Sequence, residues 1–412
     1  MSDRVLILSE NESVPHDRRV WDISRALQRA GWEVVVIAPR GTSCDSLAYE
    51  RLDGVELYRY RPAPARGGAL SYVREYSVAL WRTWRLVRRV ARDRDFDVVH
   101  ACNPPDFLLL AALSLRRRGA RFVFDHHDLV PELYLSRFGR GRDVLYRVVC
   151  ALERLAFRLA HVVIATNDSY REVALTRGRK RPDSVFVVKN APDLARFRPA
   201  RPDPDLRRGK AHLLAYVGVI GPQDGVDHAL RALAVLREGR SDWHALFAGD
   251  GDARAAMEKL RDEVGLEELV EFAGWQQDAD IVRILSTADI CLAPDPTSPL
   301  NDLSSMVKIG EYMAMGRPIV SFDLAESRRS AGDAAAYATP NDEASFAGCI
   351  AELLNDPARR AAMGATGRAR VEAGLSWEHS ERALLAAYAR ALGTPEAEQI
   401  PCLPAGELAA GS

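Results

Sequence analysis

Short runs of β-branched and other apolar residues alternate with helix-length amphipathic stretches through the first half of the chain. A helical pattern at residues 18–30 leads through Gly31 into the next apolar run, and each later run is followed by enough residues for a helix. Strands that alternate with helices in this way indicate a parallel sheet. The expected strands lie within residues 5–8, 31–38, 97–100, 121–124 and 162–165.

The alternation pauses at Asn190–Asp193 and in a Pro- and Arg-rich stretch that ends near Lys210, then begins again at Leu213. The second series of expected strands lies at residues 213–217, 245–248, 270–273, 290–293 and 319–322. We therefore expect an α/β fold with two Rossmann-like, doubly wound parallel-sheet domains. The expected parts are an N-terminal domain (1–195), a linker (196–210), a C-terminal domain (211–375), a helix packing back on the N-terminal domain (376–393) and a disordered tail (394–412).

The composition suits two domains, since 412 residues exceed one ordinary core and 47% of them are hydrophobic. Net charge is near zero but unevenly placed: residues 1–200 carry about 35 Lys and Arg against 24 Asp and Glu, and the remainder about 21 against 33. This division argues against nucleic acid bound along the whole molecule. It permits an anionic acceptor or a membrane surface at the basic first half.

Six cysteines lie far apart, without a Cys-x-x-Cys pair or a metal-ligand spacing with the histidines. The chain enters a strand at Arg4 without the features of a signal peptide, and no run of about 20 apolar residues is present. We expect a reduced, cytoplasmic protein without a metal or other cofactor, with peripheral contact at the inner face of the membrane as a further possibility.

The segment after the expected strand at 290–293 is the first candidate binding site, because ligands of open α/β sheets lie beyond the carboxyl ends of the strands. We expect a helix there that begins near Ser304 or Ser305 and ends at Gly316. Free amides at its start would attract a diphosphate, and Lys308 adds a positive charge. Glu311 shares a helix face with Lys308, so an ordinary exposed ion pair is the alternative.

Four segments of the second half carry a family resemblance: residues 247–251 (FAGDG), 270–275 (VEFAGW), 288–294 (ADICLAP) and 311–320 (EYMAMGRPIV). In order and spacing they resemble the retaining glycosyltransferases of family four, which have the GT-B fold, with two Rossmann-like domains that face each other across a cleft. The resemblance implies that Glu311 binds the ribose of a nucleotide-sugar donor.

The chain departs from the family pattern at three positions. Leu303 stands where the family usually has a Glu that contacts the donor sugar, and Asp302 is the adjacent candidate. Val219 and Asp224 stand where Arg and Lys commonly bind the diphosphate. Lys308 and the helix amides are therefore the leading replacements, with Arg19 as a supplement. The expected donor-binding residues are Gly218, Gly221, Asp302, Ser305, Met306, Val307, Lys308 and Glu311.

A second candidate site follows the expected strand at 121–124, where the chain reads Asp125-His126-His127-Asp128 and continues to Glu132. Adjacent histidines on an extended chain point in opposite directions, which disfavours a metal site and leaves an ordinary polar loop as the alternative. The resemblance favours His127 as the catalytic residue close to the reacting sugar. Asp128 and Glu132 are candidates for orienting this loop or meeting the acceptor.

The loop after the first strand, residues 9–20, is a third candidate, because in the family this loop helps to engage acceptor and diphosphate. Asp17 and Arg19 are its candidate residues. The alternative is that Asp17 only caps the following helix and that Arg19 is a solvated helix residue.

A basic helix is expected over residues 71–94. This helix is rich in arginine. It either lies on an anionic membrane or packs in the core with a solvated basic face, and we favour the core-packed interpretation. The residues expected to trace its apolar face are Val73, Tyr76, Leu80, Trp84, Val87 and Ala91.

The resemblance implies an enzyme that transfers a sugar from a nucleoside-diphosphate sugar to an acceptor hydroxyl with retention. The acceptor classes left open are a sugar, a lipid-linked intermediate and a small metabolite, and nucleic acid is not expected as a partner. A nucleotide-sugar 2-epimerase of the same fold and a catalytically silent nucleotide-sugar-binding homologue are the alternatives. A dehydrogenase is disfavoured, because Gly249-Asp-Gly251 does not extend to Gly-x-Gly-x-x-Gly.

Overall fold

A computed structural model describes residues 2–41, 45–63, 69–138 and 141–394. The chain forms two compact units: Met1–Lys189 together with Ser380–Ser412, and Asn190–His379. We call them unit 1 and unit 2. The tail expected to be disordered lies outside the described residues, apart from Thr394.

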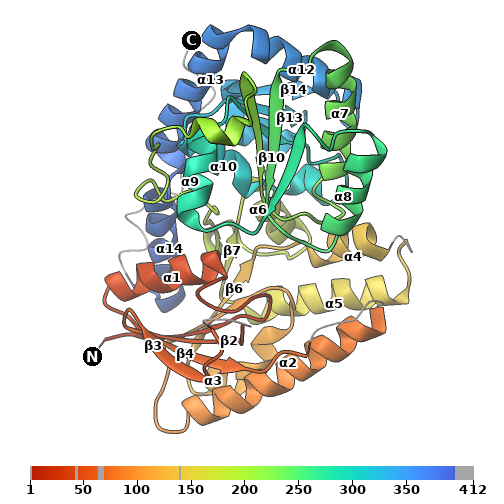
Figure 1. The fold of residues 1–412 in the computed structure, drawn as a ribbon. Helices are drawn as coiled ribbons and strands as arrows, with labels where there is room; N and C mark the ends of the chain where they lie inside the picture. Colours follow the sequence, from red (N-terminus) through yellow and green to blue (C-terminus); the bar gives the residue numbers. More distant parts are fainter. Residues whose placement is uncertain (1, 42–44, 64–68, 139–140, 395–412) are drawn as a thin grey trace. The chain divides into compact units, whose positions relative to one another are not determined.

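Unit 1 contains an eight-stranded sheet with the order β3-β4-β2-β1-β5-β6-β7-β8 (Figure 1). The five expected strands are present as β1, β2, β5, β6 and β7. The hairpin β3–β4, which is antiparallel, and the short β8 are additions. β3 alternates exposed and half-buried positions, so it lacks the continuous apolar run that marks a buried strand. The strands are β1 (Arg4–Leu8), β2 (Glu33–Pro39), β3 (Tyr49–Leu52), β4 (Val55–Tyr60), β5 (Val98–Cys102), β6 (Arg121–His126), β7 (Val162–Ala165) and β8 (Val185–Val187).

Helices pack on this sheet through their apolar faces. α2 uses Ala79, Val87 and Val90, which are buried. Val73 and Trp84 were expected on the packed face but are exposed, so that part of the prediction is wrong. The helices are α1 (Arg18–Arg29), α2 (Ala69–Val90), α3 (Leu113–Arg117), α4 (Val130–Phe138), α5 (Val144–Leu159) and α6 (Asp168–Thr176), with the 3-10 helices η1 (Leu108–Ala112) and η2 (Pro182–Ser184).

Unit 2 contains a six-stranded parallel sheet with the order β11-β10-β9-β12-β13-β14. Its first five strands in sequence were expected, and β14 is an addition. Around it lie α7 (Val226–Gly239), α8 (Arg254–Glu263), α9 (Asp278–Thr287), α10 (Val307–Ala314), α11 (Ala325–Ala331), α12 (Glu343–Asn355) and α13 (Pro357–Arg370). The strands are β9 (His212–Val217), β10 (Trp243–Ala248), β11 (Val270–Gly274), β12 (Ile290–Ala293), β13 (Ile319–Phe322) and β14 (Ala335–Ala338).

Helix α14 (Trp377–Leu392) lies within one residue of the expected bounds, 376–393, at each end. Within unit 1, Tyr388 is fully buried and meets the ring of Trp32 edge-on, with 5.1 Å between centroids. Arg29 and Glu381 form an ion pair of 2.8 Å, and Figure 1 shows α14 beside α1. The last turns of the chain's described part therefore complete the core of unit 1.

Each sheet reverses its strand order at one point, between β1 and β5 in unit 1 and between β9 and β12 in unit 2. In open α/β sheets, ligands bind outside the carboxyl ends of the strands at such a switch point. The carboxyl ends of the strands at these two switch points are therefore the expected ligand positions. Among the described residues, no helix is long and apolar enough to cross a membrane.

Candidate functional site

At the switch point of unit 2, two glycine loops pack backbone against backbone. Gly218 follows β9 and Gly249 follows β10, and a Cβ on Gly249 would lie 1.8 Å from the Gly218 carbonyl oxygen. The amide of Ile220 donates to the Asp250 carbonyl over 3.0 Å. Only glycine at position 249 permits this approach, which leaves main chain rather than side chains at the carboxyl end of β9.

Helix α10 begins at Val307, two to three residues later than expected. Ser304 is extended, and Met306 occupies the N-cap position without a side-chain hydrogen bond to the helix. The methionine side chain has no oxygen that can accept from the first helical amides, so the helix start has no side-chain cap from this position. The buried Tyr312 hydroxyl accepts from the Val217 amide at 2.9 Å and lies 3.2 Å from the Leu292 carbonyl, which ties α10 to β9 and β12.

Lys308 is buried, which rules out the exposed Lys/Glu pair considered above. Its Nζ donates to Asp295 Oδ1 at 2.7 Å, lies 4.0 Å from Asp224 Oδ1 and sits 4.9 Å from the centre of the Tyr216 ring. Burial alone would lower the pKa of Lys308, but Asp295, Tyr216 and Asp224 outweigh it and raise the pKa. Lys308 is therefore a cation whose charge is already balanced by carboxylates.

Asp224 closes the loop after β9 by accepting the Gly221 amide at 3.0 Å. Burial raises the pKa of Asp224 to about 6, although Lys308 opposes this shift. Asp295 keeps one buried oxygen, Oδ2, without a hydrogen-bond partner in the described part of the chain. Two carboxylates around one ammonium make this cluster net negative once Asp224 ionises.

The remaining donor candidates lie around this cluster. Ser305 donates to the buried Glu326 at 3.0 Å, and Asp302 accepts from the Thr297 hydroxyl at 2.7 Å. Glu311 is half-buried one turn beyond Lys308. The structure thus brings Lys308 close to Gly218, since a Cβ at position 218 would lie 3.3 Å from Lys308 Cε. Asp302 lies in a short 3-10 helix (Asn301–Leu303) before α10.

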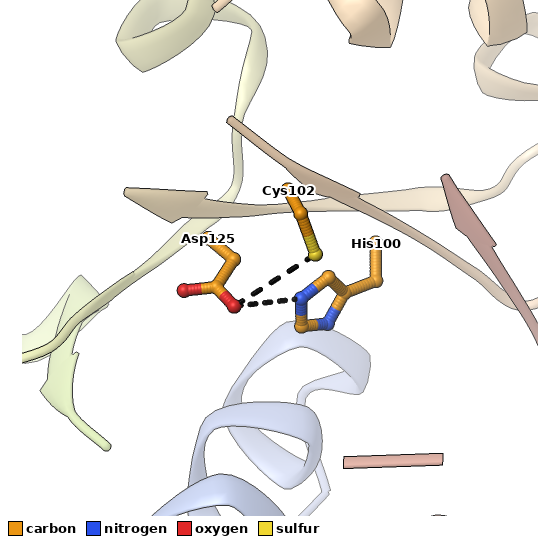
Figure 2. A group of neighbouring side chains, drawn as sticks. All are labelled: His100, Cys102 and Asp125. Atoms are coloured by element: carbon orange, nitrogen blue, oxygen red, sulfur yellow. Dashed lines mark hydrogen bonds and ion pairs between the residues drawn. The ribbon is translucent and has the colours of Figure 1, made fainter. Parts of the chain in front are cut away.

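In unit 1, Asp125 at the end of β6 is the centre of a buried polar cluster. The Arg19 guanidinium of α1 donates to both Asp125 oxygens, at 2.8 and 2.7 Å. His100 and Cys102 of β5 point toward the same carboxylate, with His100 Nε2 3.5 Å away (Figure 2). Burial would raise the pKa of Asp125, but Arg19 and two histidines hold it well below its usual range.

His127 is positioned by the loop after β5. The Asn103 side-chain oxygen accepts the amides of His127 and Asp128 at 2.9 and 3.0 Å, and its amide group donates to Asp106 at 2.8 Å. His127 Nδ1 lies 3.7 Å from Asp125 Oδ2. Burial would lower the pKa of His127, but Asp125 outweighs it and raises the pKa.

His126 has different surroundings: its ring contacts Phe157 and Tyr170, and its Nε2 lies 3.4 Å from Glu153 Oε1. The adjacent histidines therefore do not share a ligand site, as the alternation of an extended chain predicts.

Glu132, Asp17 and Arg19 each have a structural partner. Glu132 pairs with Arg177 at 2.6 Å, and Arg177 also reaches the buried Glu153 at 2.6 Å. Asp17 caps α1 by accepting the Val20 amide at 3.1 Å, and its other oxygen accepts from the Ser9 hydroxyl at 3.2 Å. Arg19 is buried rather than solvated.

Sequence reasoning missed three residues of unit 1 at this edge. His100 joins Asp125 to the Tyr388 hydroxyl, with 2.8 Å between Nδ1 and that oxygen, and Asn103 holds the His127 loop. Glu10, just after β1, has its pKa raised to about 8 by burial and by Glu75. A polar residue within two positions of the end of a buried strand was the available signal for Glu10 and Asn103. The His100 contact, in contrast, joins segments 288 residues apart.

His100, Cys102 and Asp125 have the ligand types of a metal site, with ligand atoms within 4.8 Å of one another. However, Asp125 already binds the Arg19 cation through both oxygens. Burial and Asp125 also raise the pKa of the Cys102 thiol, which opposes the thiolate that a metal requires. The group fits an internal hydrogen-bond network better than a metal site.

Two family models match the chain, one in each half. The glycosyl transferase 4-like domain matches residues 16–191, and the model described as glycosyl transferases group 1 matches residues 211–356. This chain is a glycosyltransferase. The nucleotide-sugar 2-epimerase alternative is not favoured, because both models describe sugar transfer.

Two curated relatives of this glycosyltransferase illustrate the likeness. The D-inositol 3-phosphate glycosyltransferase of Kineococcus radiotolerans is 28% identical over 92% of this chain and 91% of its own. The 2-deoxystreptamine glucosyltransferase of Streptomyces kanamyceticus is 27% identical over 61% of this chain and 66% of its own, so that match spans just under two thirds of the relative.

Solved structures support the GT-B fold. Sucrose-phosphate synthase from Thermosynechococcus elongatus superposes with a TM-score of 0.77 at 19% identity, over 95% of this chain and 99% of that one. Anabaena Alr3699/HepE in complex with UDP-glucose gives 0.70 at 16% identity, over 94% and 99%. At these identities the likeness establishes the fold alone.

Proposed function

We propose that this glycosyltransferase uses a nucleoside-diphosphate sugar as donor and binds it in unit 2 at the switch point between β9 and β12. The observation that carries the proposal is the convergence there of the Gly218–Gly221 loop, the start of α10 and Lys308. Main-chain amides and a helix start are suited to a diphosphate. The HepE structure that contains UDP-glucose supports the same donor class for this chain.

Glu311 is the proposed ribose ligand. It lies one turn after Lys308 on α10, whose position is held by Tyr312 against two strands. A carboxylate can accept hydrogen bonds from two adjacent hydroxyls. Four residues before or at the start of α10 are proposed to contact the sugar and the diphosphate: Asp302, Ser305, Met306 and Val307.

The diphosphate is proposed to be bound mainly by amides. Lys308 carries the nearest cation, but Asp295 binds it at 2.7 Å, and Asp224 adds negative charge when ionised. The donor therefore binds best when Asp224 holds a proton, because the cluster is then close to neutral. In this scheme Lys308 orders the loop after β9 and contributes part of the positive charge that stabilises the departing diphosphate.

In unit 1, His127 is the proposed catalytic residue. Its ring is held near Asp125 and its backbone is fixed by Asn103, so its position is preorganised. We propose that it hydrogen-bonds the donor sugar as positive charge develops at the anomeric carbon. Asp128 and Glu10 are acids at the same strand edge whose raised pKa values suit contact with an acceptor hydroxyl.

The proposed chemistry is front-face displacement with retention. The bond from the anomeric carbon to the diphosphate oxygen breaks, the acceptor oxygen bonds to the same face, and the acceptor proton passes to the departing phosphate. The protein contributes orientation and electrostatic stabilisation of the leaving group. We propose that the reaction needs no metal or other cofactor, and that the acceptor is a sugar, a lipid-linked intermediate or a small metabolite.

A thermal-shift screen against UDP, GDP, dTDP, ADP and their sugars, with and without EDTA, tests the donor proposal. A ligand that binds only the native state raises the apparent melting temperature. We expect one nucleotide to stabilise the protein selectively and EDTA to leave that shift unchanged. No shift with any nucleotide contradicts the donor site. Proton NMR of the product formed from that donor then reports the anomeric configuration.

A further inference from the structure

Helix α2 of unit 1 presents tryptophan and arginine together on its outward face. Val73, Trp81 and Trp84 are 48, 51 and 39% exposed. Trp81 follows Val73 by eight residues and Trp84 follows Trp81 by three, which places all three on one side of the helix. Arg85 and Arg88 are exposed on the same side. We call Val73, Trp81, Trp84, Arg85 and Arg88 the α2 outer face.

The arginines of this face are ordered against the indole rings. The Arg85 guanidinium lies 4.9 Å from the centre of the Trp81 ring, and Arg88 lies 4.9 Å from that of Trp84. Cation–π contacts of this kind keep the indoles extended beside the charges. The outer face is therefore a defined surface of paired rings and cations.

Packing of unit 1 does not account for the outer face. α2 meets the core through Ala79, Thr83, Val87 and Val90, which are buried on the opposite side. Single exposed apolar residues are common, but two exposed tryptophans on one helical stripe leave a large apolar surface in water. The packing of unit 1 therefore does not require an indole ring at either position.

Charge indicates what kind of partner fits. The exposed positions among residues 71–90, all of them described, include four arginines and no acid. The acid of this stretch, Glu75, is half-buried. A basic helix whose exposed side combines tryptophan and arginine matches the interface of an anionic bilayer, where indoles lie at headgroup depth and guanidinium groups contact phosphates.

Helix α5 also exposes apolar and basic side chains, although its sequence contains no tryptophan. Val144 and Val148 are exposed, and so are Arg147, Arg154 and Arg158. Its acid, Glu153, is buried against Arg177. A second helix of unit 1 thus exposes apolar and cationic side chains while it keeps its carboxylate inside.

We propose that the α2 outer face binds the surface of an anionic phospholipid bilayer, so that this glycosyltransferase works as a peripheral membrane protein. The tryptophans supply the apolar contact and the arginines supply the attraction to lipid phosphates. The proposal concerns unit 1 alone and is independent of the donor site in unit 2.

Co-sedimentation of the full chain with vesicles tests it. We expect binding to vesicles of phosphatidylcholine with phosphatidylglycerol, weak binding to phosphatidylcholine alone, and release by salt. Trp81→Ser/Trp84→Ser and Arg85→Glu/Arg88→Glu should each lower the partition coefficient at least about 10-fold, since each basic residue near such a surface contributes roughly fivefold. Both changes lie on exposed positions, so the melting temperature should be retained.

Two control variants match these changes. Tyr49→Ser removes an aromatic residue of unit 1 that is 50% exposed, and Arg198→Glu/Arg201→Glu reverses two exposed charges of unit 2. Both should bind vesicles within about twofold of the wild type. Absence of binding to the anionic vesicles at low salt, equal losses in the controls, or tryptophan-dependent self-association in place of vesicle binding would each overturn the proposal.

Discussion

Arg19 and Asp125 form a bidentate ion pair, with bonds of 2.8 and 2.7 Å, in the interior of unit 1. Arg19 comes from the first turn of α1 and Asp125 from the end of β6, so the pair joins two elements at the strand edge that carries His127. Both side chains are buried. The pair sets the charge beside His127 and also affects the stability of the fold.

We expect Asp125→Asn to destabilise the protein by about 3–5 kcal/mol at neutral pH, because it leaves the Arg19 charge buried without a counterion. Asp125 has a depressed pKa, so its contribution is present above the ordinary Asp range and is lost as pH falls through the lower folded value. Urea denaturation at pH 7 and at about pH 2, which is below the ordinary pKa of Asp, measures both effects.

The matched control for this variant is Asp53→Asn, which removes the exposed partner of Arg25, 3.6 Å away, and should change stability by less than about 0.5 kcal/mol. Arg19→Met/Asp125→Asn removes both charges and should be milder than Asp125→Asn alone if the unpaired charge is the cause. A loss below about 1 kcal/mol for Asp125→Asn at pH 7 would contradict this account.

The strands that line the candidate sites could be predicted from sequence because they are buried runs of apolar residues with helices between them. β7, β12 and β13 have the expected bounds. The edge hairpin β3–β4 could not be predicted in this way, because one of its strands is largely exposed and polar. Burial on both faces, rather than strand formation itself, produces the recognisable pattern.

The partners of the site residues were harder to predict. Spacing placed Lys308 and Glu311 on one helix, but the Lys308 counterion, Asp295, follows a different strand. On α2, two overlapping stripes have helical spacing, and the one that contains Thr83 is buried while the one with Trp84 is exposed. Periodicity identifies a helix, whereas three-dimensional packing decides which of two similar faces is covered.

His127→Ala should lower kcat about 100-fold and leave donor affinity within about threefold, since the proposed hydrogen bond strengthens as charge develops in the transition state. Steady-state transfer assays and donor titration separate the two quantities. His228→Ala is the control: this half-buried histidine of unit 2 pairs with Glu343 at 2.9 Å, and its loss should leave kcat unchanged. Wild-type turnover in His127→Ala would remove His127 from the mechanism.

Glu311→Ala and Lys308→Ala should each weaken nucleotide-sugar binding about 10-fold, because they remove the ribose acceptor and the nearest cation to the diphosphate. Isothermal titration with the nucleotide selected by thermal shift gives the dissociation constants. Lys259→Ala and Glu263→Ala break an exposed ion pair of 3.2 Å in the same unit and should leave them unchanged.

The Lys308 variant needs a second form, since Lys308→Ala leaves the Asp295 carboxylate buried without its counterion. Lys308→Ala/Asp295→Asn removes both charges and should restore stability but not donor affinity. Donor binding equal to the wild type in this double variant would show that Lys308 serves only the fold.

Asp224 should make donor affinity depend on pH. Its pKa is raised to about 6 by burial, so it becomes anionic between pH 5 and 8, beside the proposed diphosphate position. We expect wild-type affinity to fall about five- to tenfold over that interval, because a second negative charge then opposes the donor. Asp224→Asn keeps an oxygen that can accept the Gly221 amide, and its affinity should stay nearly constant with pH.

The same substitution should affect stability with a defined sign. The pKa of Asp224 is raised in the folded state, so its contribution to the free energy of unfolding is greatest below the ordinary pKa of Asp. This contribution is lost as pH rises through about 6. Asp224→Asn should therefore be more stable than the wild type by about 1–3 kcal/mol at pH 8 and show little gain at pH 4. Urea denaturation at the two pH values measures the difference. Equal gains in stability at both pH values would mean that ionisation of Asp224 is not their cause. Parallel pH profiles of donor affinity in the wild type and in Asp224→Asn would place the diphosphate away from the loop after β9.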